Sequence, residues 1–496
     1  MTETFSGNRG LVIEEPLIFE QDTPGLSGVD LPAAPDVETR LGGLERKGPI
    51  GLPGLAEPTV VRHYTRLSQK NCGIDTVFYP LGSCTMKHNP RLNEKMARLP
   101  GFADVHPFQP ESTVQGALEL IDTTAHWLKT LTGMPAIAMS PAAGAHGEFC
   151  GLMAIRAALD DRGEKRTRML VPESAHGTNP ASAAACGFTV DPIPATSRGR
   201  VDLAALKAKL GDDVAGIMLT NPNTCGLFED EVQEIAAAIH GAGGYFYCDG
   251  ANYNAIVGRV RVADLGVDCM HINLHKTFST PHGGGGPGAG PTVLSNALAA
   301  YAPLPYVIHD DKGFRMVEHP EQSDGKPSGR IKGYHGQFGV FVRALSYMMS
   351  LGADGLRQAS SDAVLNANYL LARLKGELSA SFEDGPCMHE ALFDDRFLKD
   401  TGVTTLDFAK ALIDEGFHPM TMYFPLVVHG ALLMEPTETE SKATLDGFAD
   451  TVLGLARRAK AGEADAFKAA PIHTPRRRLD ETAAARSPVL RWKKDA

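Results

Sequence analysis

The sequence predicts an α/β protein with a large domain built on a mostly parallel sheet, followed by a smaller α+β domain. Short apolar strands alternate with amphipathic helices from about residue 136 onward, which is the pattern of βαβ units. The chain has 496 residues, of which 43% are apolar and 22% charged, so its composition is that of a globular protein of about two to four domains. Such sheets bind ligands at the carboxyl ends of their strands.

The first 111 residues are predicted to form an extended arm. They are rich in Pro and Gly pairs and show only one short helical pattern, near 89–98. A helix is then predicted to start after Ser112 or Thr113 and to run to Thr132, because Leu118, Ile121 and Leu128 are spaced to lie on one buried face. The large domain is predicted to span 112–338.

Seven strands and four intervening helices are predicted within the large domain. The strands are 137–139, 168–171, 189–193, 216–219, 245–248, 270–273 and 291–294, and the helices are 148–160, 180–186, 202–210 and 231–240. Residues 339–375 read as long helices, and 382–468 as a small α+β unit ending in a helix at 438–458. The second domain is therefore predicted to span 339–470, with a tail at 471–496.

Composition and charge exclude several classes of function. The net charge of −11 and the isoelectric point near 5.9 argue against a nucleic-acid or membrane-surface binder, although the tail at 471–496 is basic. The eight cysteines form no CxxC pair and no secretion signal opens the chain, which predicts a cytoplasmic protein. The longest stretch without Asp, Glu, Lys or Arg, 277–309, contains five prolines, so no membrane span is expected.

A turn of small residues follows the first predicted strand. It runs from Ser140 to Gly147 and opens a helix, so the backbone N–H groups of Gly144, Ala145 and His146 face whatever lies before the helix. The positive end of a helix dipole suits a phosphate group. From this segment alone, an ordinary tight turn between strand and helix is an equally good interpretation.

Polar residues also follow the predicted strands at 168–171 and 216–219. His176 comes after the strand at 168–171, where it would stack on a planar ring or transfer a proton, although a single histidine is more often structural. Asn221 follows the strand at 216–219, in a segment that also has ordinary turn signals. Neither residue identifies a function by itself.

Two further strand ends complete a chemical set. Asp249, followed by Ala251, ends an apolar strand, and a buried carboxylate there requires a partner such as a cationic ring, a metal or a helix end. Lys276 ends the next strand segment and offers an amine nucleophile. A phosphate cradle, a stacking His, a ring-pairing Asp and a Schiff-base Lys on successive strand ends together predict pyridoxal 5′-phosphate.

Three other patterns are weaker. Residues 283–288 match GxGxxG, but no helix opens there and Pro287 interrupts the run, so we expect a flexible glycine loop beside Lys276. His271 and His275 are four residues apart, but on a strand and turn they would not converge, and no metal site is predicted. No GxSxG motif of a serine hydrolase occurs.

At these residues the sequence resembles the glycine-cleavage P protein family, the decarboxylating glycine dehydrogenases. The resemblance extends from about residue 60 to the C-terminus. The segments that carry it are 79–90 (YPLGSCTMKHNP), 141–148 (PAAGAHGE), 176–180 (HGTNP), 221–224 (NPNT), 249–252 (DGAN), 273–278 (NLHKTF) and 434–442 (MEPTETESK).

The resemblance implies a fold, a reaction and a set of site residues. The fold would be the aspartate-aminotransferase-like type I fold of pyridoxal-phosphate enzymes. The oxidoreductase reaction would decarboxylate glycine and pass the aminomethyl group to the lipoyl group of H protein. Cofactor contacts and catalysis would come from Lys276, Asp249 and His176, and further cofactor contacts from Gly144, Ala145, His146, Ala251, Asn221 and His275.

The glycine carboxylate is not placed by the resemblance. Candidates for its recognition are Arg330, Lys332, His335, Lys87 and His88. His429 is a departure from the family pattern, which favours an acidic residue near that position.

The resemblance also implies partners. Single-chain members are about twice this length, and many bacteria split them into two subunits; with Lys276 present, this chain resembles the catalytic one. A homologous subunit 1 in an α2β2 heterotetramer, lipoylated H protein, and the T and L proteins would be its partners, and the basic tail would dock between subunits. Two alternatives stay open: another pyridoxal-phosphate reaction, such as that of an aminotransferase or a cysteine-sulfur lyase, and a non-catalytic partner subunit.

Overall fold

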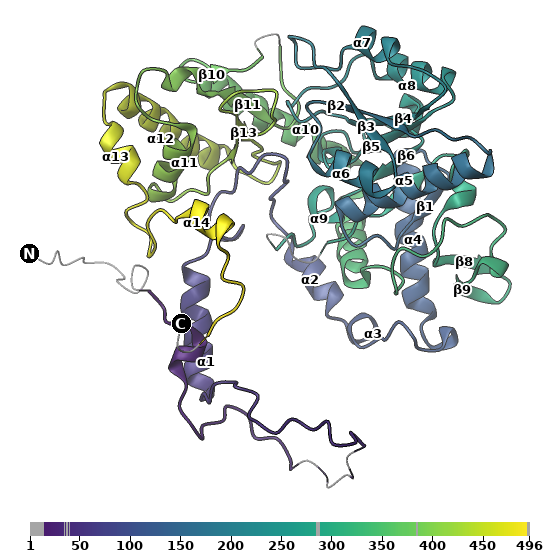
Figure 1. Cartoon of the computed structure of the whole chain (residues 1–496), viewed down its shortest axis with the longest axis horizontal. Helices are drawn as coiled ribbons and strands as arrows, with labels where there is room; N and C mark the ends of the chain where they lie inside the picture. Colours follow the sequence, from purple (N-terminus) through teal and green to yellow (C-terminus); the bar gives the residue numbers. More distant parts are fainter. Residues whose placement is uncertain are drawn as a thin grey trace, which may run out of the picture.

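A seven-stranded sheet forms the centre of the large domain. The computed structural model describes residues 14–33, 35, 38, 40–283, 288–382 and 385–493. The sheet has the order β1-β7-β6-β5-β4-β2-β3 (Figure 1). Its strands are β1 (Ala136–Ala138), β2 (Arg168–Pro172), β3 (Thr189–Ile193), β4 (Val214–Thr220), β5 (Tyr245–Asp249), β6 (Cys269–His271) and β7 (Thr292–Leu294). Only β7 runs antiparallel to its neighbours within this sheet, which confirms the predicted mostly parallel arrangement.

Helices cover both faces of this sheet. They are α4 (Gln115–Thr132), α5 (Gly144–Asp161), α6 (Thr178–Ala185), α7 (Leu203–Ala208), α8 (Val232–Gly241) and the single turn α9 (Leu274–Thr277). Successive strand residues point to opposite faces, so Phe246 of β5 packs in the cluster that includes Leu128 of α4 and Ile239 of α8. Its neighbour Tyr247 packs in the cluster that includes Leu152 of α5. Both faces are therefore buried, as a parallel sheet requires.

The smaller domain follows a long helix, α10 (Phe338–Leu374). Its antiparallel sheet has the order β10-β11-β13-β12 and is built from β10 (Ser379–Ala380), β11 (Ala391–Asp394), β12 (Thr421–Met422) and β13 (Leu432–Met434). The helices α11 (Thr405–Asp414), α12 (Lys442–Lys460) and α13 (Ala464–Ala469) belong to the same unit. Phe393, Phe408 and Phe448 are among the fully buried side chains of its core. This is the predicted α+β unit.

The first part of the N-terminal arm, through about residue 69, extends away from both domains (Figure 1), whereas Phe78 packs in the core of the smaller domain and Glu94 pairs with Arg343. It contains α1 (Glu57–Gln69), which the sequence analysis did not predict. His63 is its one buried residue, and Val61, Tyr64 and Leu67 are exposed. α2 (Arg91–Ala97), which was predicted, and α3 (Pro100–Ala103) follow. The basic tail, with α14 (Glu481–Arg486), returns to this arm, where the Trp492 ring stacks on Phe19 with centroids 5.0 Å apart.

The large domain also has an element that the sequence analysis did not predict. A hairpin of β8 (Tyr306–Asp310) and β9 (Gly313–Val317) was not expected and forms a separate two-stranded sheet. The predicted glycine loop falls mostly on 284–287, which lie outside the described residues. None of the helices in the described ranges is long and apolar enough to cross a membrane.

Candidate active site

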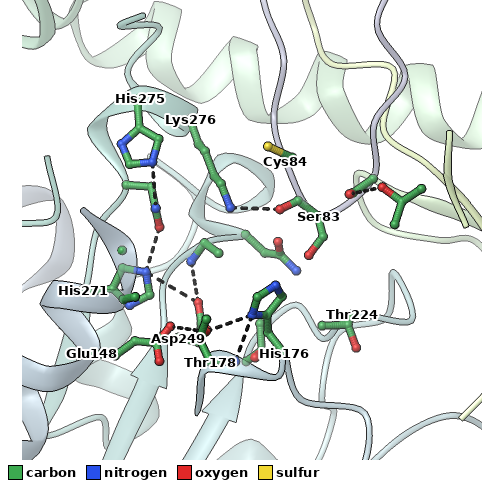
Figure 2. A pocket seen from close by; sticks show the side chains of 18 of the residues that line it. Ser83, Cys84, Glu148, His176, Thr178, Thr224, Asp249, His271, His275 and Lys276 are labelled. Carbon is green, nitrogen blue, oxygen red and sulfur yellow. Dashed lines mark hydrogen bonds and ion pairs between the residues drawn. The ribbon is translucent and has the colours of Figure 1, made fainter. Parts of the chain in front are cut away.

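A cavity of about 480 Å³ lies at the carboxyl ends of the central strands. The large domain contributes Asp249, Lys276 and other strand-end residues to its lining. Ser83 comes from the segment that precedes the large domain, and Phe424 from the smaller domain. The cavity is therefore formed by three parts of the chain, and Figure 2 shows the side chains that converge on it.

Lys276 lies in the single turn α9, directly after β6. Its side chain is buried, with 9% of the residue exposed, and its Nζ donates a 2.9 Å hydrogen bond to the backbone carbonyl of Ser83 (Figure 2). That carbonyl holds the amine inside the cavity. Because its partner is an uncharged backbone carbonyl and not a carboxylate, the amine is not held in an ion pair. It can therefore react with the aldehyde or ketone group of a ligand.

Asp249 is the last residue of β5 and is almost fully buried. Its Oδ2 accepts a 2.9 Å hydrogen bond from Asn179 Nδ2, and its Oδ1 accepts one of 2.9 Å from the Ala251 N–H. Burial alone would raise the pKa of Asp249, but His271, 3.7 Å from Oδ1, and these two donors together lower it below its ordinary value. The carboxylate is therefore ionised and can pair with a cationic ring nitrogen.

His176 lies beyond β2, at the exposed rim of the cavity. Its Nδ1 is 2.8 Å from Thr178 Oγ1, and the Thr178 hydroxyl donates a 2.7 Å hydrogen bond to Glu148 Oε1. The imidazole ring meets the Phe424 ring edge-on, with centroids 5.6 Å apart. These contacts fix the imidazole so that one of its faces borders the cavity (Figure 2).

The N-terminus of α5 forms another wall of the cavity. Gly144 and Ala145 line it, and no side chain caps the helix there. A Cβ on Gly144 would lie 2.6 Å from Asn273 Nδ2, so glycine is needed for the helix to begin this close to α9. The first backbone N–H groups of a helix have no partner within it, so this wall offers donors and a positive dipole end to an anion.

His275 and His282 lie beside Lys276. Burial, together with the neighbouring charge of Lys276, lowers the pKa of His275 to about 3, so its ring is neutral. The pKa of His282 is lowered by the same two causes, and its Nε2 lies 3.2 Å from Cys84 Sγ. These groups can form hydrogen bonds with an anion but do not add positive charge to it.

The comparisons with known proteins agree on one family. Residues 359–472 match the family model described as glycine dehydrogenase, C-terminal domain, and 149–285 match aminotransferase class-V. The chain is 68% identical to a probable glycine dehydrogenase (decarboxylating) subunit 2 of Caulobacter vibrioides, an alignment that covers 99% of this chain and 94% of the relative. The chain belongs to the glycine dehydrogenase (decarboxylating) subunit 2 family. A subunit 2 from Caldanaerobacter subterraneus is 52% identical over 96% and 99% of the two chains.

Solved structures confirm the fold of this glycine dehydrogenase subunit 2 family member. A crystal structure of a glycine decarboxylase (P-protein), in inhibitor-bound form, superposes with a TM-score of 0.71 at 23% identity, covering 84% of this chain and 94% of that one. A cysteine desulfurase from Thermococcus onnurineus has a TM-score of 0.58 at 15% identity, with 77% and 95% covered. The predicted aspartate-aminotransferase-like fold and the family resemblance are confirmed.

The structure brings most of the predicted site residues together. Lys276, Asp249, His176, Gly144, Ala145, Ala251 and His275 all line the one cavity. The side chain of His146 does not, because its Nδ1 accepts from the Ala142 N–H and its Nε2 lies 3.0 Å from the Ile331 carbonyl oxygen. Asn221 is buried beneath the cavity wall, where its Oδ1 accepts from the Glu229 N–H. Neither residue is among the lining residues that the structure describes, and their contacts with a cofactor stay predictions.

The candidates for carboxylate recognition lie elsewhere. Lys87 is buried in an ion pair with Glu438, at 2.5 Å, and His88 lies 3.8 Å from Asp75. Arg330 and His335 both pair with Glu318, and Lys332 lies on the same segment. None of the five is among the cavity-lining residues that the structure describes. His429 pairs with Asp395 at the surface.

Several residues of the site were missed by the sequence analysis. Glu148 accepts from Thr178 and from Ser182, and Asn179 holds Asp249. Both could have been predicted from the sequence, because each lies near the start of a helix that follows a strand end, where ligands of such sheets bind. Ser83 and Phe424 carried no such signal, since only the tertiary fold brings them here.

Proposed function

We propose that this chain is the pyridoxal-phosphate-binding, catalytic subunit of a glycine-decarboxylating enzyme, an oxidoreductase of the glycine cleavage system. It decarboxylates glycine, releases CO2 and transfers the aminomethyl group to the lipoyl group of an H protein. The observation that carries the proposal is the convergence of Lys276 and the ionised Asp249 in one cavity of a chain that belongs to the subunit 2 family.

The cavity residues fit pyridoxal phosphate. The α5 N-terminus at Gly144 and Ala145 would hold the phosphate, and Lys276 the aldehyde carbon. Asp249 would pair with the pyridine nitrogen, and the His176 ring would stack on the pyridine face. When bound, this cofactor supplies an electron-accepting ring that stabilises negative charge on the carbon of glycine.

The chain's own residues orient this ring and move protons. Asp249 would keep a proton on the ring nitrogen of the bound cofactor, because its carboxylate is ionised and itself anchored by Asn179. His176 is held by Thr178, so its imidazole stays at the cavity rim as a proton-transfer group, and the Lys276 amine is a second one. Phe424 meets the His176 ring edge-on and gives the rim an apolar surface there.

The proposed partners follow from the family. A homologous subunit 1 completes an α2β2 heterotetramer, and lipoylated H protein accepts the aminomethyl group, with the T and L proteins acting on later steps. The tail at 471–493 supports a docking role, because it is basic and lies along the arm, where Arg476 pairs with Glu14. We also propose a cytoplasmic location, because all eight cysteines are free thiols, as is usual in a reducing compartment.

The experiment that tests the proposal uses the full chain mixed with pyridoxal phosphate. Lys276→Ala should abolish the absorbance band of the lysine-bound cofactor, whereas the control Lys332→Ala should keep it. A Lys276→Ala chain that retains the band would overturn the cofactor assignment. With subunit 1 and lipoylated H protein added, the wild type should exchange bicarbonate with the carboxyl carbon of glycine, and an aminotransferase or a cysteine-sulfur lyase should not.

A further inference from the structure

A second group of ionisable residues lies in the smaller domain, outside the cavity lining. His389 and Glu390 directly precede β11, and Glu435 directly follows β13. These strands pair antiparallel with Ala391 opposite Met434, so the next step of the register places Glu390 opposite Glu435. Two carboxylates in such a position repel each other unless a positive charge lies between them.

The group is fully buried and its polar atoms are incompletely satisfied. The exposed fractions of His389 and Glu390 are 0%, and that of Glu435 is 1%. Among the residues that the structure describes, none forms a hydrogen bond with either ring nitrogen of His389, and none donates one to Glu390 Oε2 or Glu435 Oε2 unless one of these two carboxyl groups is protonated and bonds to the other. Buried polar atoms normally have partners, so these atoms indicate a ligand that converges on the three side chains.

The charges around the group also lack compensation. Glu438 is a third buried carboxylate nearby, and its cationic partner is Lys87. Lys276 is the other ammonium group that acts on Glu390 and Glu435. Two lysines thus face three carboxyl groups in a medium where unpaired charge is costly.

The spacing of the ligand atoms suits a metal ion. His389 Nε2 lies 4.0 Å from Glu390 Oε2 and 3.9 Å from Glu435 Oε1, and one ligand atom from each residue lies within 4.8 Å of the others. A point central to three atoms spaced about 4 Å apart is about 2.3 Å from each of them, close to the metal–ligand distances of about 2.0–2.6 Å in proteins.

We propose that His389, Glu390 and Glu435 bind one divalent first-row transition metal ion between the ends of β11 and β13. One imidazole with two carboxylates is a mixed nitrogen and oxygen ligand set, which ions such as Mn²⁺ and Zn²⁺ accept. The ion supplies the positive charge that the opposed carboxylates require. It would bind His389 Nε2 and Glu390 Oε2, which are unpartnered, together with Glu435 Oε1, which also accepts from Thr85.

The ion would also stabilise the segment that holds Lys276. Glu390 accepts a hydrogen bond from the Ser83 N–H, and Glu435 accepts one from the Thr85 hydroxyl. The carbonyl of Ser83 in turn accepts from Lys276 Nζ. A metal that fixes both carboxylates therefore fixes residues 83–85 against the cofactor lysine, a structural role that does not depend on the proposed reaction.

Metal binding is tested directly on the full, untagged chain loaded with pyridoxal phosphate. After treatment with a chelator and dialysis against Mn²⁺ or Zn²⁺, the wild type should retain about one equivalent of metal per chain. Glu435→Gln and His389→Gln should retain less than a tenth of that amount. The matched control is Glu229→Gln, which changes another buried glutamate that accepts from Asn223 and Val201, and it should bind as the wild type does.

Two readouts keep the test decisive even where a variant folds poorly. Bound Mn²⁺ in the wild type should show a nitrogen coupling from the imidazole in pulsed electron paramagnetic resonance. Added metal should raise the melting temperature of the wild type and of Glu229→Gln by several degrees. A wild type that binds no metal, or that binds it without nitrogen coupling, would overturn the proposal. The remaining explanation would be that Glu390 and Glu435 share a proton in place of a metal ion. Equal binding by folded Glu435→Gln would overturn it as well.

Discussion

The amine of Lys276 donates to the main-chain carbonyl of Ser83, a residue 193 positions earlier in the chain. Ser83 belongs to neither the large sheet nor the smaller domain, and it lies in the segment that joins the arm to the body. The same residue donates its N–H to Glu390, next to β11. The connecting segment therefore lies between the large domain's lysine and the smaller domain's carboxylate, and the cavity depends on all three.

Asp249→Asn should damage turnover more than cofactor binding. An amide keeps the shape and the contact with Asn179, but it carries no charge to hold the ring nitrogen protonated. We expect kcat for glycine decarboxylation to fall about 100-fold or more, while the absorbance of the lysine-bound cofactor persists. Steady-state assays with subunit 1 and H protein, together with spectra of the same samples, measure both effects.

The matched control for that change is Asp268→Asn. Asp268 is also largely buried beside the sheet, but it accepts from the Phe246 N–H and pairs with His240, away from the cavity. Its substitution should affect stability and leave kcat close to the wild-type value. Equal losses of kcat in the two variants would argue that Asp249 has only a structural role.

Thr178→Val should weaken the positioning of His176. Valine matches threonine in shape but removes the hydroxyl that joins His176 to Glu148. A hydrogen bond contributes about 1 kcal/mol, so we expect kcat to fall roughly five-fold to ten-fold with a smaller change in KM. Thr178→Ser restores the hydroxyl and should restore kcat, and a serine variant as slow as the valine one would contradict the positioning role.

The strand ends of the large domain could be predicted because their signals are local. Asp249 closes an apolar strand and Lys276 follows the next one, and parallel strands bring such ends to one edge of a sheet. The bounds predicted for β3 agree with the structure, since its edge-strand pattern is bordered by Gly187 and Pro194. Periodicity and turn signals were sufficient to predict the site residues at the strand ends of the large domain.

The rest of the site depends on long-range contacts that no local pattern encodes. Phe424 and Ser83 reach the cavity only after the smaller domain and the connecting segment have packed against the sheet. Lys87 and Arg330 were chosen for their charge, and the structure shows each paired with a distant glutamate. The helix α1 was missed for the opposite reason, because almost no part of it is buried.

The core of the large sheet should determine the stability of the chain. Phe246→Ala empties a fully buried position in β5, between α4 and α8, and should cost about 3–5 kcal/mol in the free energy of unfolding. Leu44→Ala in the arm, where the side chain is 88% exposed, should change it by less than about 0.5 kcal/mol. Urea unfolding followed by circular dichroism compares the two, and similar costs would contradict the assigned core.

Glu229 should make stability fall as the pH rises through the weakly acidic range. Its burial raises the pKa from 4.5 to about 7 in the folded chain, whereas the unfolded chain keeps the ordinary value. Between these values the folded state binds more protons than the unfolded state, so the stabilisation is present below pH 4.5 and is lost by about pH 7. The full loss is about 3 kcal/mol, because each pKa unit corresponds to about 1.4 kcal/mol.

Glu229→Gln isolates this effect because glutamine does not titrate. The amide can still accept from the Val201 N–H, so the fold should be kept. We expect the unfolding free energy of the wild type, minus that of the variant, to fall between pH 4.5 and pH 7.5, as measured by urea unfolding in matched buffers. Curves that stay parallel over this range would show that Glu229 ionises normally, and that its contacts with Asn223 and Val201 offset its burial.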